Sequence, residues 1–309
     1  MITDRIDSIT RIKDFRSTLP APKSVKIELT GRCNYRCGFC ALRTRENQPK
    51  RDMDFAFFKR VALQMREAGV EELGLFYLGE SFMNQGLLLA ALKYAKSIGF
   101  PYVFLTSNAS MADPELVGKL MDAGLDSLKW SVNACDKEQF VKVMGVKEAL
   151  FEKALENIKS AWEIRRKTRL YASSIRYDGE QQSKMEKLLQ ERVIPYVDQH
   201  YWLPLYSMGA FATQREAELG YKPTAGNQGR LEALREPLPC WSAFTEGHIT
   251  ADGKLSACCF DANSSWTMAD LTKTSFMSGW NSNEFVELRK AHLKKDVRGT
   301  VCENCIAYS

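Results

Sequence analysis

The sequence predicts an α/β fold with a parallel sheet and a second, smaller domain at its carboxyl end. Between residues 24 and 206, six short apolar runs alternate with amphipathic stretches. This strand–helix alternation is typical of parallel strands joined by right-handed crossovers. Six units are fewer than the eight of a closed barrel, so an open (β/α)6 barrel and a doubly wound sheet both fit the pattern. The alternation stops near residue 207, where loop-forming residues begin.

Each expected element has its own local signal. The expected strands are the apolar runs SVKIEL, LGLFYL, YVFLTS, SLKWSV, LYASSIRY and PYVDQHYWLPLY. The helices between them show apolar residues at helical spacing: FAFFKRVALQMREAG, LLLAALKYAKSIG, DPELVGKLMDAG, ALFEKALENIKSAWEIRRK and QQSKMEKLLQERV. We expect Gly69 to end the first helix, and Asp113 to cap the third with Pro114 in its first turn.

The carboxyl-terminal third has a different organisation. Residues 207–239 are rich in glycine and are predicted to form a linker or lid. The stretch HITADGKLSACC predicts a β-hairpin with its turn at Asp252 and Gly253. A helix over NSNEFVELRKAHLKK follows, capped by Asn281 or Ser282. We therefore divide the chain into an extension at 1–23, a barrel at 24–206, the linker, and a small domain at 240–309.

Composition predicts a cytoplasmic protein. A hydrophobic content of 45% over 309 residues can build a large core. The first residues lack the apolar segment of a secretory signal, and no apolar run approaches the ~18 residues of a membrane span. Nine cysteines in a reducing compartment indicate metal binding or catalysis rather than disulfides. The basic residues behind the net charge of +5 are dispersed, so we predict neither a nucleic-acid nor a membrane partner.

Three cysteines stand close together in GRCNYRCGFC: Cys33, Cys37 and Cys40. On a helix this spacing would place them on one face, so a buried cysteine stripe is one interpretation. The segment is rich in poor helix formers, Gly31, Asn34 and Gly38, and it directly follows the first strand, where a ligand-binding loop would lie. Zinc usually requires a fourth ligand nearby, whereas an Fe–S cluster held by three cysteines keeps one iron open.

This stretch resembles the CxxxCx-aromatic-C signature of the radical S-adenosylmethionine (SAM) enzymes, with Phe39 as the aromatic residue. YLGES at the second strand resembles the family's GGE-like motif beside the SAM amino group, with Leu78 in place of the first glycine. TSNAS and WSVNA resemble two further SAM-contact stretches, with Asn133 in place of an acid. The resemblance implies these SAM contacts: Gly79, Glu80, Ser107, Asn108, Ser131, Asn133, Ser173 and Arg176.

The resemblance also implies a fold and a chemistry. Such enzymes use a partial TIM-like barrel, here a partial (β/α)6 barrel. Their open iron binds the amino and carboxylate groups of SAM, and one electron then frees a 5′-deoxyadenosyl radical that takes a hydrogen atom from unactivated carbon. A flavodoxin- or ferredoxin-type protein is the expected electron donor.

A second set of thiols lies in the small domain: Cys240, Cys258, Cys302 and Cys305. Four thiolates complete either a [4Fe-4S] cluster or a zinc site. GKLSACCFD and SFMSGWNSNEFVELR resemble the twitch domain, the shortened form of the SPASM domain that follows radical SAM barrels. A full SPASM domain binds two clusters and needs more cysteines than this chain has. We therefore expect one auxiliary [4Fe-4S] cluster with four protein ligands, and two [4Fe-4S] clusters in the whole protein.

A fully ligated auxiliary cluster favours a role in electron transfer. We predict a radical SAM oxidoreductase that dehydrogenates an alcohol carbon of a small polar substrate, such as a sugar, an aminocyclitol or a nucleotide sugar. The alternative is an epimerase in which a spare cysteine, Cys135 or Cys259, donates a hydrogen atom; otherwise both are small buried hydrophobes. If the second hairpin strand continues through Cys258 and Cys259, the two side chains point to opposite faces.

Other interpretations stay open at this point. Peptide-modifying relatives often carry a leader-binding domain, and about twenty-three residues before the first strand are too few for one. A non-catalytic Fe–S or zinc protein would need no SAM contacts, so those stretches count against it. Of the three histidines, we expect His200 at the carboxyl end of the sixth strand, at the catalytic mouth, beside Tyr201, Trp202 and Tyr206. His248 and His292 are expected to be structural.

Overall fold

The computed structural model describes residues 1–40, 51–203, 238–261, 264–303 and 305 of the chain. Within them lies one nine-stranded sheet with the order β6-β5-β4-β3-β2-β1-β7-β8-β9. Neighbouring strands from β6 to β7 are parallel, and β8 and β9 are antiparallel to their neighbours. The strands are β1 (Ser24–Ile27), β2 (Glu72–Gly74), β3 (Tyr102–Ser107), β4 (Ser127–Ser131), β5 (Arg169–Ile175), β6 (Gln199–Leu203), β7 (Glu246–Ile249), β8 (Lys254–Ser256) and β9 (Thr267–Asp270).

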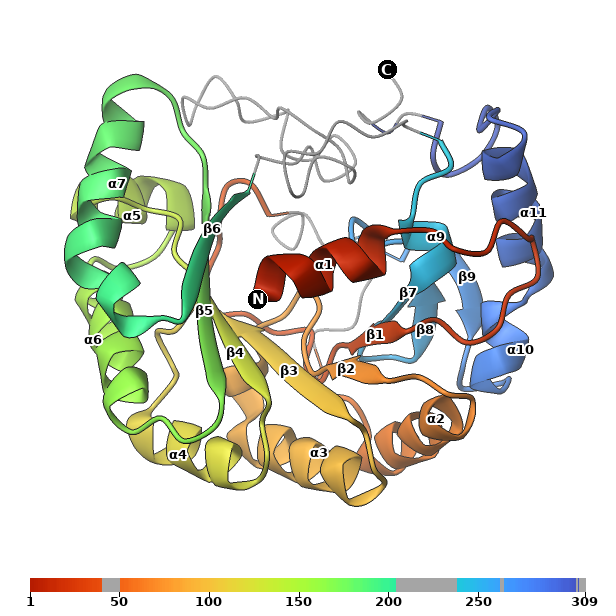
Figure 1. Cartoon of the computed structure of the whole chain (residues 1–309), viewed down its shortest axis with the longest axis horizontal. Helices are drawn as coiled ribbons and strands as arrows, with labels where there is room; N and C mark the ends of the chain where they lie inside the picture. The colour runs from red at the N-terminus through yellow and green to blue at the C-terminus, as the bar shows by residue number, and fades with distance from the viewer. Residues whose placement is uncertain (41–50, 204–237, 262–263, 304, 306–309) are drawn as a thin grey trace.

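The sheet curves into a partial barrel, and Figure 1 shows helices along its outer side. These helices are α2 (Phe55–Glu67), α3 (Gln85–Ser97), α4 (Pro114–Asp122), α5 (Lys137–Met144), α6 (Ala149–Glu163) and α7 (Gly179–Arg192). Two short 3-10 helices, η2 (Ser81–Asn84) and η3 (Ile194–Tyr196), precede α3 and β6. The predicted partial (β/α)6 barrel is confirmed, and the doubly wound alternative is wrong.

The helices begin and end where local chemistry predicts. The Asp113 side chain accepts hydrogen bonds from the backbone N–H groups of Glu115 and Leu116, with Pro114 at the first position of α4. Gly69, in the left-handed region at φ 99°, follows the end of α2. Because these signals lie within a few residues of each helix end, the sequence alone identifies them.

The carboxyl-terminal region continues the barrel sheet. β7 pairs with β1 over four residues, from Ser24 opposite Glu246 to Ile27 opposite Ile249. The predicted hairpin is formed by β7 and β8, with Gly253 at φ 84° in its turn. The helices α9 (Ser242–Thr245), α10 (Phe276–Trp280) and α11 (Asn283–Leu293) belong to this region. The predicted cap of α11 is also confirmed, since the Ser282 side chain accepts from Phe285 N–H.

An amino-terminal helix, α1 (Ile2–Thr10), lies inside the curve of the sheet (Figure 1). Ile2 N–H donates to Gln199 Oε1 at 3.0 Å, and Arg5 Nη2 lies 2.7 Å from Glu72 Oε2. Gln199 and Glu72 are the first residues of β6 and β2, so α1 crosses the amino-terminal opening of the barrel. The sequence predicts only an extension here, and this helix is not among the expected elements.

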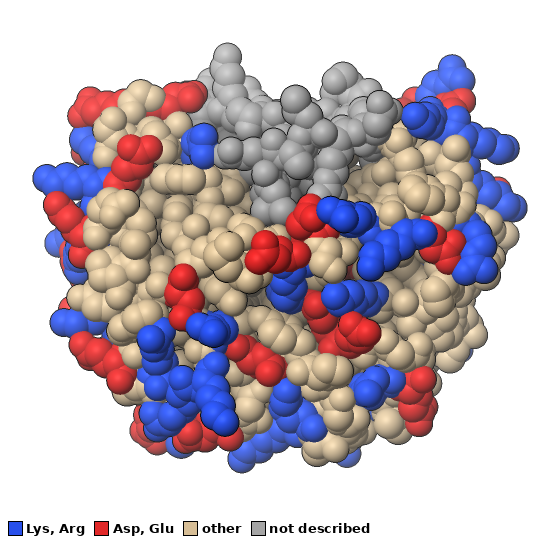
Figure 2. Space-filling view, in the orientation of Figure 1, with Lys and Arg blue, Asp and Glu red and all other residues tan. Residues whose placement is uncertain are grey.

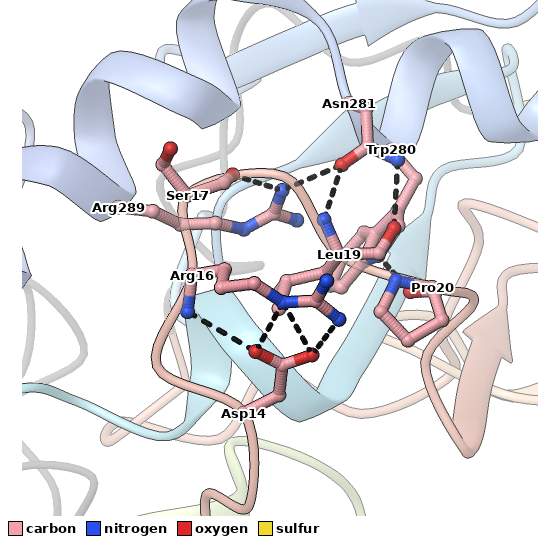
Figure 3. Close-up of polar contacts among 8 residues, drawn as sticks. All are labelled: Asp14, Arg16, Ser17, Leu19, Pro20, Trp280, Asn281 and Arg289. Carbon is pink, nitrogen blue, oxygen red and sulfur yellow. Dashed lines mark hydrogen bonds and ion pairs between the residues drawn. The ribbon is translucent and has the colours of Figure 1, made fainter.

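The segment after α1 is fixed to the carboxyl-terminal helices (Figure 3). Asn281 Oδ1 accepts the Leu19 N–H at 2.9 Å, and its Nδ2 donates to the Leu19 carbonyl at 2.8 Å. Trp280 Nε1 donates to the Pro20 carbonyl at 2.9 Å. The fully buried Arg289 stacks over the Trp280 ring at 4.3 Å, and burial lowers the pKa of Arg289 to about 9. The amino-terminal segment thus packs as one unit with α10 and α11.

The sixth strand begins later than its pattern suggests. β6 starts at Gln199, so His200 is its second residue and lies near its amino end. His200 Nε2 is 3.0 Å from Ser174 Oγ on β5. The expectation that His200 stands at the catalytic mouth is therefore wrong. Tyr206 lies outside the described residues, and so does the predicted linker at 207–239 except for its last two residues.

Surface charge is mixed on the face seen in Figure 2, where Lys and Arg lie among Asp and Glu. Several charged groups of the molecule form exposed pairs, such as Lys119 with Glu115 at 2.6 Å and Arg166 with Asp122 at 3.3 Å. Across the part of the chain that the structure describes, no helix has the length and apolar character to cross a membrane.

Candidate active site

The first cysteine motif forms a loop after β1. Arg36 N–H donates to the Met144 carbonyl at 2.9 Å, and Gly38 N–H donates to the Val143 carbonyl at 2.7 Å. The carboxyl-terminal end of α5 therefore fixes the backbone of the cysteine loop. The Cys33 sulfur accepts the Tyr35 N–H at 3.4 Å, a contact that favours a thiolate. The helical alternative for this segment is wrong.

The three thiols of this loop form a donor set that suits an Fe–S cluster. Burial, followed by the charge of Glu80, raises the pKa of the Cys33 thiol to about 12. Burial raises the pKa of Cys37 as well, and the neighbouring Cys40 and Cys33 raise it further. Buried thiolates in each other's field need positive charge between them, which iron ions supply. The residues present therefore fit the implied cluster.

Two side-chain amides and one hydroxyl tie the cysteine loop to the TSNAS stretch after β3. Asn108 Nδ2 donates to Asn34 Oδ1 at 2.9 Å, and Asn34 Nδ2 donates to Ser110 Oγ at 2.9 Å. Ser110 Oγ in turn lies 2.8 Å from Asn108 Oδ1. Of these residues only Asn108 is a predicted SAM contact. Asn34 and Ser110 are not among the predicted SAM contacts, although Asn34 stands inside the cysteine motif and Ser110 ends the TSNAS stretch.

The YLGES stretch packs directly on the loop that follows β1. A Cβ added at Gly79 would stand 1.9 Å from the Thr30 carbonyl oxygen, so a side chain does not fit there. Glu80 N–H donates to the Arg32 carbonyl at 2.8 Å. Gly79 thus allows the backbone of this stretch to approach the start of the cysteine loop.

The Glu80 carboxylate is buried among donors. It accepts from Ser107 Oγ at 3.0 Å, from Asn108 N–H at 2.8 Å and from Phe82 N–H at 3.2 Å. Burial raises the pKa of Glu80, while these hydrogen bonds lower it. The structure therefore brings together three of the predicted SAM contacts, and Glu80 is the residue that joins them.

The remaining predicted SAM contacts lie further along the sheet. Asn133 Oδ1 accepts the Ile175 N–H at 3.0 Å, and Ser131 and Asn133 both line a small cavity of about 30 Å³. Ser173 Oγ accepts from Lys129 Nζ at 3.1 Å inside the barrel. The Arg176 guanidinium stands 5.7 Å from the Trp202 ring centre. For these four, as for Gly79, Glu80, Ser107 and Asn108, a contact with SAM stays a prediction.

The four cysteines of the carboxyl-terminal region share one neighbourhood. Burial raises the pKa of the Cys258 thiol, and the charges of neighbouring cysteines, Cys302 and Cys240 among them, raise it further. Burial raises the pKa of Cys302 too, with Cys240 and Cys305 as its charged neighbours. The Cys258 sulfur accepts the Phe260 N–H at 3.4 Å. This donor set also suits a cluster.

The thiols in both sets stand apart rather than around one point. Within the described residues, no three His, Cys, Asp or Glu side chains are grouped closely enough to hold a single metal ion. A four-iron cluster is larger than one ion, so its ligands are more widely spaced. Within each set the thiols are buried and raise one another's pKa, so they are neighbours, and their role as cluster ligands stays a prediction.

A cavity of about 270 Å³ lies inside the barrel. Cys40 of the first motif and Cys259 of the second region both line it, and α1 forms its floor with Ile2, Arg5, Ile6 and Ile9. Polar side chains from the strands line its walls: Lys26, Thr106, Ser127, Lys129, Tyr201 and Glu246. The cavity therefore touches both cysteine regions at once.

The two spare cysteines have different positions. Cys259 is among the described residues that line the cavity, and Cys135 is not. Cys135 is buried beside Asp136, with its sulfur 3.5 Å from Asp136 Oδ2, and burial raises its pKa to about 11. β8 ends at Ser256, so Cys258 and Cys259 lie in the turn beyond the strand and the expectation from strand alternation does not apply.

Buried charges join the cavity wall to β7. Lys26 Nζ lies 2.8 Å from Glu246 Oε2, and His248 Nε2 lies 3.1 Å from the same oxygen. The side chains of Lys26, Glu246 and His248 are 9%, 2% and 0% exposed. Because β1 and β7 are parallel neighbours, all three point to the barrel interior. The sequence does not predict this group, because Lys26 and Glu246 are 220 residues apart.

Family models match most of the chain. A model of the radical SAM superfamily matches residues 27–190, and a SPASM model, an iron-sulfur cluster-binding domain, matches residues 240–306. A probable GTP 3′,8-cyclase of Saccharolobus solfataricus is 30% identical over 46% of this chain and 44% of its own length. A probable GTP 3′,8-cyclase of Sulfurisphaera tokodaii is 22% identical over 82% of this chain and 86% of its own length. The chain matches less than half of the first relative.

Solved structures share the fold at low sequence identity. Streptococcus suis SuiB bound to S-adenosylmethionine is 14% identical with a TM-score of 0.68, over 95% of this chain and 72% of that chain. BtrN in complex with AdoMet and 2-DOIA is 14% identical with a TM-score of 0.60, over 92% of each chain. The radical SAM model covers more than half of the sequence and includes the cysteine loop. The chain therefore belongs to the radical SAM superfamily, as an enzyme that uses SAM and two Fe–S clusters and carries a SPASM domain at its carboxyl end.

Proposed function

We propose that the enzyme dehydrogenates an alcohol carbon of a small polar molecule held in the barrel cavity. One observation carries the proposal: Cys40 and Cys259 line the same cavity of about 270 Å³. A substrate there lies between the SAM cluster loop and the turn that holds Cys258. It is therefore within reach of both cofactors.

When bound, the cofactors would supply hydrogen-atom abstraction at the first cluster and acceptance of one electron at the auxiliary cluster. The alcohol group also loses one proton, for which the Glu246 carboxylate in the cavity wall is the acceptor. The chain's own residues bind and orient the substrate. Thr106, Ser127 and Tyr201 offer hydroxyl groups, and Lys129 offers an ammonium group, all from strands of the rigid sheet. Such a wall suits a substrate with several hydroxyl or amino groups, such as a sugar, an aminocyclitol or a nucleotide sugar. The floor of α1 and the barrel wall exclude water from the reacting carbon.

The assignment of individual residues belongs to the same proposal. Cys33, Cys37 and Cys40 hold the SAM cluster, and Cys240, Cys258, Cys302 and Cys305 hold the auxiliary one. The residues that would contact SAM are Gly79, Glu80, Ser107, Asn108, Ser131, Asn133, Ser173 and Arg176. The barrel occupies residues 24–206, and the auxiliary domain occupies residues 240–309. A flavodoxin- or ferredoxin-type protein delivers the electron that starts the reaction.

The first test is reductive cleavage of SAM. Because Cys37 is one of only three protein ligands, Cys37→Ala should lower 5′-deoxyadenosine formation to background after anaerobic reconstitution and reduction with dithionite. Iron content should be about eight per wild-type chain, and about four when Cys33, Cys37 and Cys40 are all replaced. Normal 5′-deoxyadenosine formation by Cys37→Ala would contradict the assignment, and zinc among the remaining ligands would contradict the auxiliary cluster.

The second test identifies the reaction. Wild-type enzyme is incubated with SAM and a panel of sugars, aminocyclitols and nucleotide sugars, with GTP included because of the names of the curated relatives. A product two mass units lighter than its precursor supports dehydrogenation. A cyclised product of unchanged mass from GTP would replace the proposal with the relatives' activity. The precursor peptide SuiA, to which SuiB is bound in a solved structure, tests the peptide-modifying alternative.

A second candidate, epimerisation, is favoured by the position of Cys259. Its thiol lines the cavity, and a thiol hydrogen is held more weakly than a hydrogen on carbon, so it can quench a carbon radical. Turnover in D2O would then give a product of unchanged skeleton with one carbon-bound deuterium. Cys259→Ala should abolish this product, whereas Cys135→Ala should retain it. Equal dehydrogenated product from both variants would exclude the epimerase.

A further inference from the structure

Tyr77 connects the SAM-binding stretch to the auxiliary region. It lies two residues before Gly79, and its hydroxyl donates to the Cys258 carbonyl at 2.9 Å, with the Asp261 carbonyl at 3.1 Å. Its ring centre stands 5.5 Å from that of His248 on β7. The side chain therefore reaches from the end of β2 to the backbone of an auxiliary-cluster ligand.

Glu28 makes a second connection between the same two regions. Its side chain is buried, with the residue 1% exposed. Oε1 accepts the Gly79 N–H at 3.1 Å, and Oε2 accepts the Ala251 N–H at 3.1 Å. Glu28 N–H donates to the Ile249 carbonyl at 2.8 Å. One carboxylate thus bridges the glycine of the SAM motif and the β7–β8 turn.

The SAM-binding stretch has little freedom to move on its own. Gly79 packs so closely on Thr30 that an added Cβ would stand 1.9 Å from its carbonyl oxygen. Glu28 and Tyr77 fix the stretch to the auxiliary region on one side, and Ser107 and Asn108 hold Glu80 on the other. A displacement at Gly79–Glu80 is therefore transmitted to residues 251–261.

We propose that Tyr77 and Glu28 are positioning residues that couple the SAM site to the auxiliary cluster, so that occupancy of the SAM site changes the reduction potential of that cluster. Cluster potentials depend on hydrogen bonds to the ligating sulfurs. The Phe260 N–H donates to the Cys258 sulfur at 3.4 Å, in the same turn whose carbonyls Tyr77 holds. A shift of Tyr77 alters this hydrogen bond.

The proposal uses the assignment of Gly79 and Glu80 to SAM and does not depend on the identity of the substrate. Linkage makes the effect reciprocal: the redox state of the auxiliary cluster changes SAM affinity by the same factor. A tenfold change in affinity corresponds to about 59 mV for a one-electron couple.

The test is a redox titration of the reconstituted enzyme followed by electron paramagnetic resonance, with and without S-adenosylhomocysteine. This probe keeps the amino, carboxylate and adenosine groups of SAM and has no sulfonium bond to cleave. We expect the probe to shift the midpoint potential of the auxiliary cluster in the wild type. Tyr77→Phe removes only the hydroxyl and should abolish the shift. Tyr94→Phe, in the outer helix α3, is the matched control. In this variant the probe should shift the midpoint potential of the auxiliary cluster as it does in the wild type.

Two further measurements keep the result interpretable. An iron content of about eight and a measured dissociation constant for S-adenosylhomocysteine show that each variant holds both clusters and binds the probe. Glu28→Gln, which keeps one carbonyl acceptor, should reduce the shift in midpoint potential. This variant replaces Tyr77→Phe in the test if Tyr77→Phe loses its auxiliary cluster. An unchanged potential in the wild type, or equal shifts in Tyr77→Phe and the wild type, would overturn the coupling. Either result leaves SAM cleavage and product formation, and hence the proposed function, separately testable.

Discussion

At the scale of single residues, Gly79 shows how little space the SAM site leaves. A methyl group at this position would meet the Thr30 carbonyl oxygen at 1.9 Å, which is backbone and cannot move aside cheaply. Gly79→Ala should therefore displace the stretch that carries Glu80 and weaken SAM binding by at least about tenfold, corresponding to about 1.4 kcal/mol. Equilibrium dialysis of the reconstituted enzyme measures this.

The matched control for that change is Gly86→Ala. A Cβ at Gly86, in the first turn of α3, would have its nearest neighbour at 3.9 Å. Alanine also favours a helix over glycine by up to about 1 kcal/mol. We expect normal SAM affinity and equal or higher thermal stability in Gly86→Ala. If both variants bind SAM equally well, the close approach at Gly79 has no role in the site.

The buried His200 should make the folding stability of the protein decrease in acid. Burial lowers the pKa of His200 to about 4 from its ordinary 6.5. Between these values the unfolded chain binds a proton that the folded chain does not, so stability falls as pH falls, by at most about 1.4 kcal/mol per pH unit for one proton. Urea midpoints between about pH 7.5 and pH 5 should decline less in His200→Gln than in the wild type. Equal declines of the urea midpoint in the two proteins would show that His200 does not contribute to the loss of stability in acid.

At the scale of elements, α1 is held by a pair that the solvent barely reaches. The Arg5 and Glu72 side chains are 15% and 7% exposed, and the Arg5 guanidinium also lies 4.0 Å from the Phe104 ring centre. Arg5→Met keeps the packing but leaves the carboxylate without this partner, a loss of about 1.5–3 kcal/mol. Amide hydrogen exchange in α1 should therefore accelerate roughly tenfold to a hundredfold.

A second arginine, directly after the same helix, provides the control. Arg11 pairs with Asp7 across one turn, but their side chains are 69% and 39% exposed, and such pairs contribute little. Arg11→Met should leave the exchange of α1 within about twofold of the wild type. If Arg5→Met behaves like Arg11→Met, the pair with Glu72 does not hold the floor of the cavity.

The elements that the sequence identifies are those with local signals. Asp113 and Pro114 mark α4, and Asp252 and Gly253 mark the hairpin, because each signal stands beside the feature it creates. α1 has a buried isoleucine stripe, yet its place in the barrel opening depends on partners in β2 and β6. The start of β6 depends likewise on pairing with β5, which explains the misplaced His200.

The residues of the site also fall into those with local sequence signals and those that depend on distant partners. The cysteine motifs and YLGES are each contiguous in the chain, so the order of their residues is enough to indicate their chemistry. The contacts of Tyr77 with Cys258 and of Glu28 with Ala251 join residues 181 and 223 positions apart. No spacing rule predicts such pairs, because the fold alone brings them together.

At the scale of the whole molecule, the continuous sheet predicts one unfolding unit. β1 pairs with β7 over four residues, and the buried Lys26–Glu246 contact crosses that junction. Separating the regions would expose both charges and an open strand edge. In a variant lacking Cys33, Cys37 and Cys40, urea should therefore abolish the absorbance of the auxiliary cluster and the far-ultraviolet circular dichroism in coincident transitions.

Early loss of the cluster absorbance, at a urea concentration where most of the circular dichroism remains, would instead describe an auxiliary domain that unfolds alone. The contacts of Asn281 and Trp280 with the segment around Leu19 argue against that outcome, because they fix the amino-terminal segment to the same region.

The position of β7 beside β1 also sets the order in which the protein can be completed during translation. Lys26 and Glu246 are 220 residues apart, so a ribosome adding about 5–20 residues per second needs roughly 10–45 s between them. For that time the nascent barrel has an open edge at β1, the kind of edge to which another chain can add. The Lys26 ammonium group stands beside that edge, and its charge discourages association until Glu246 arrives to neutralise it.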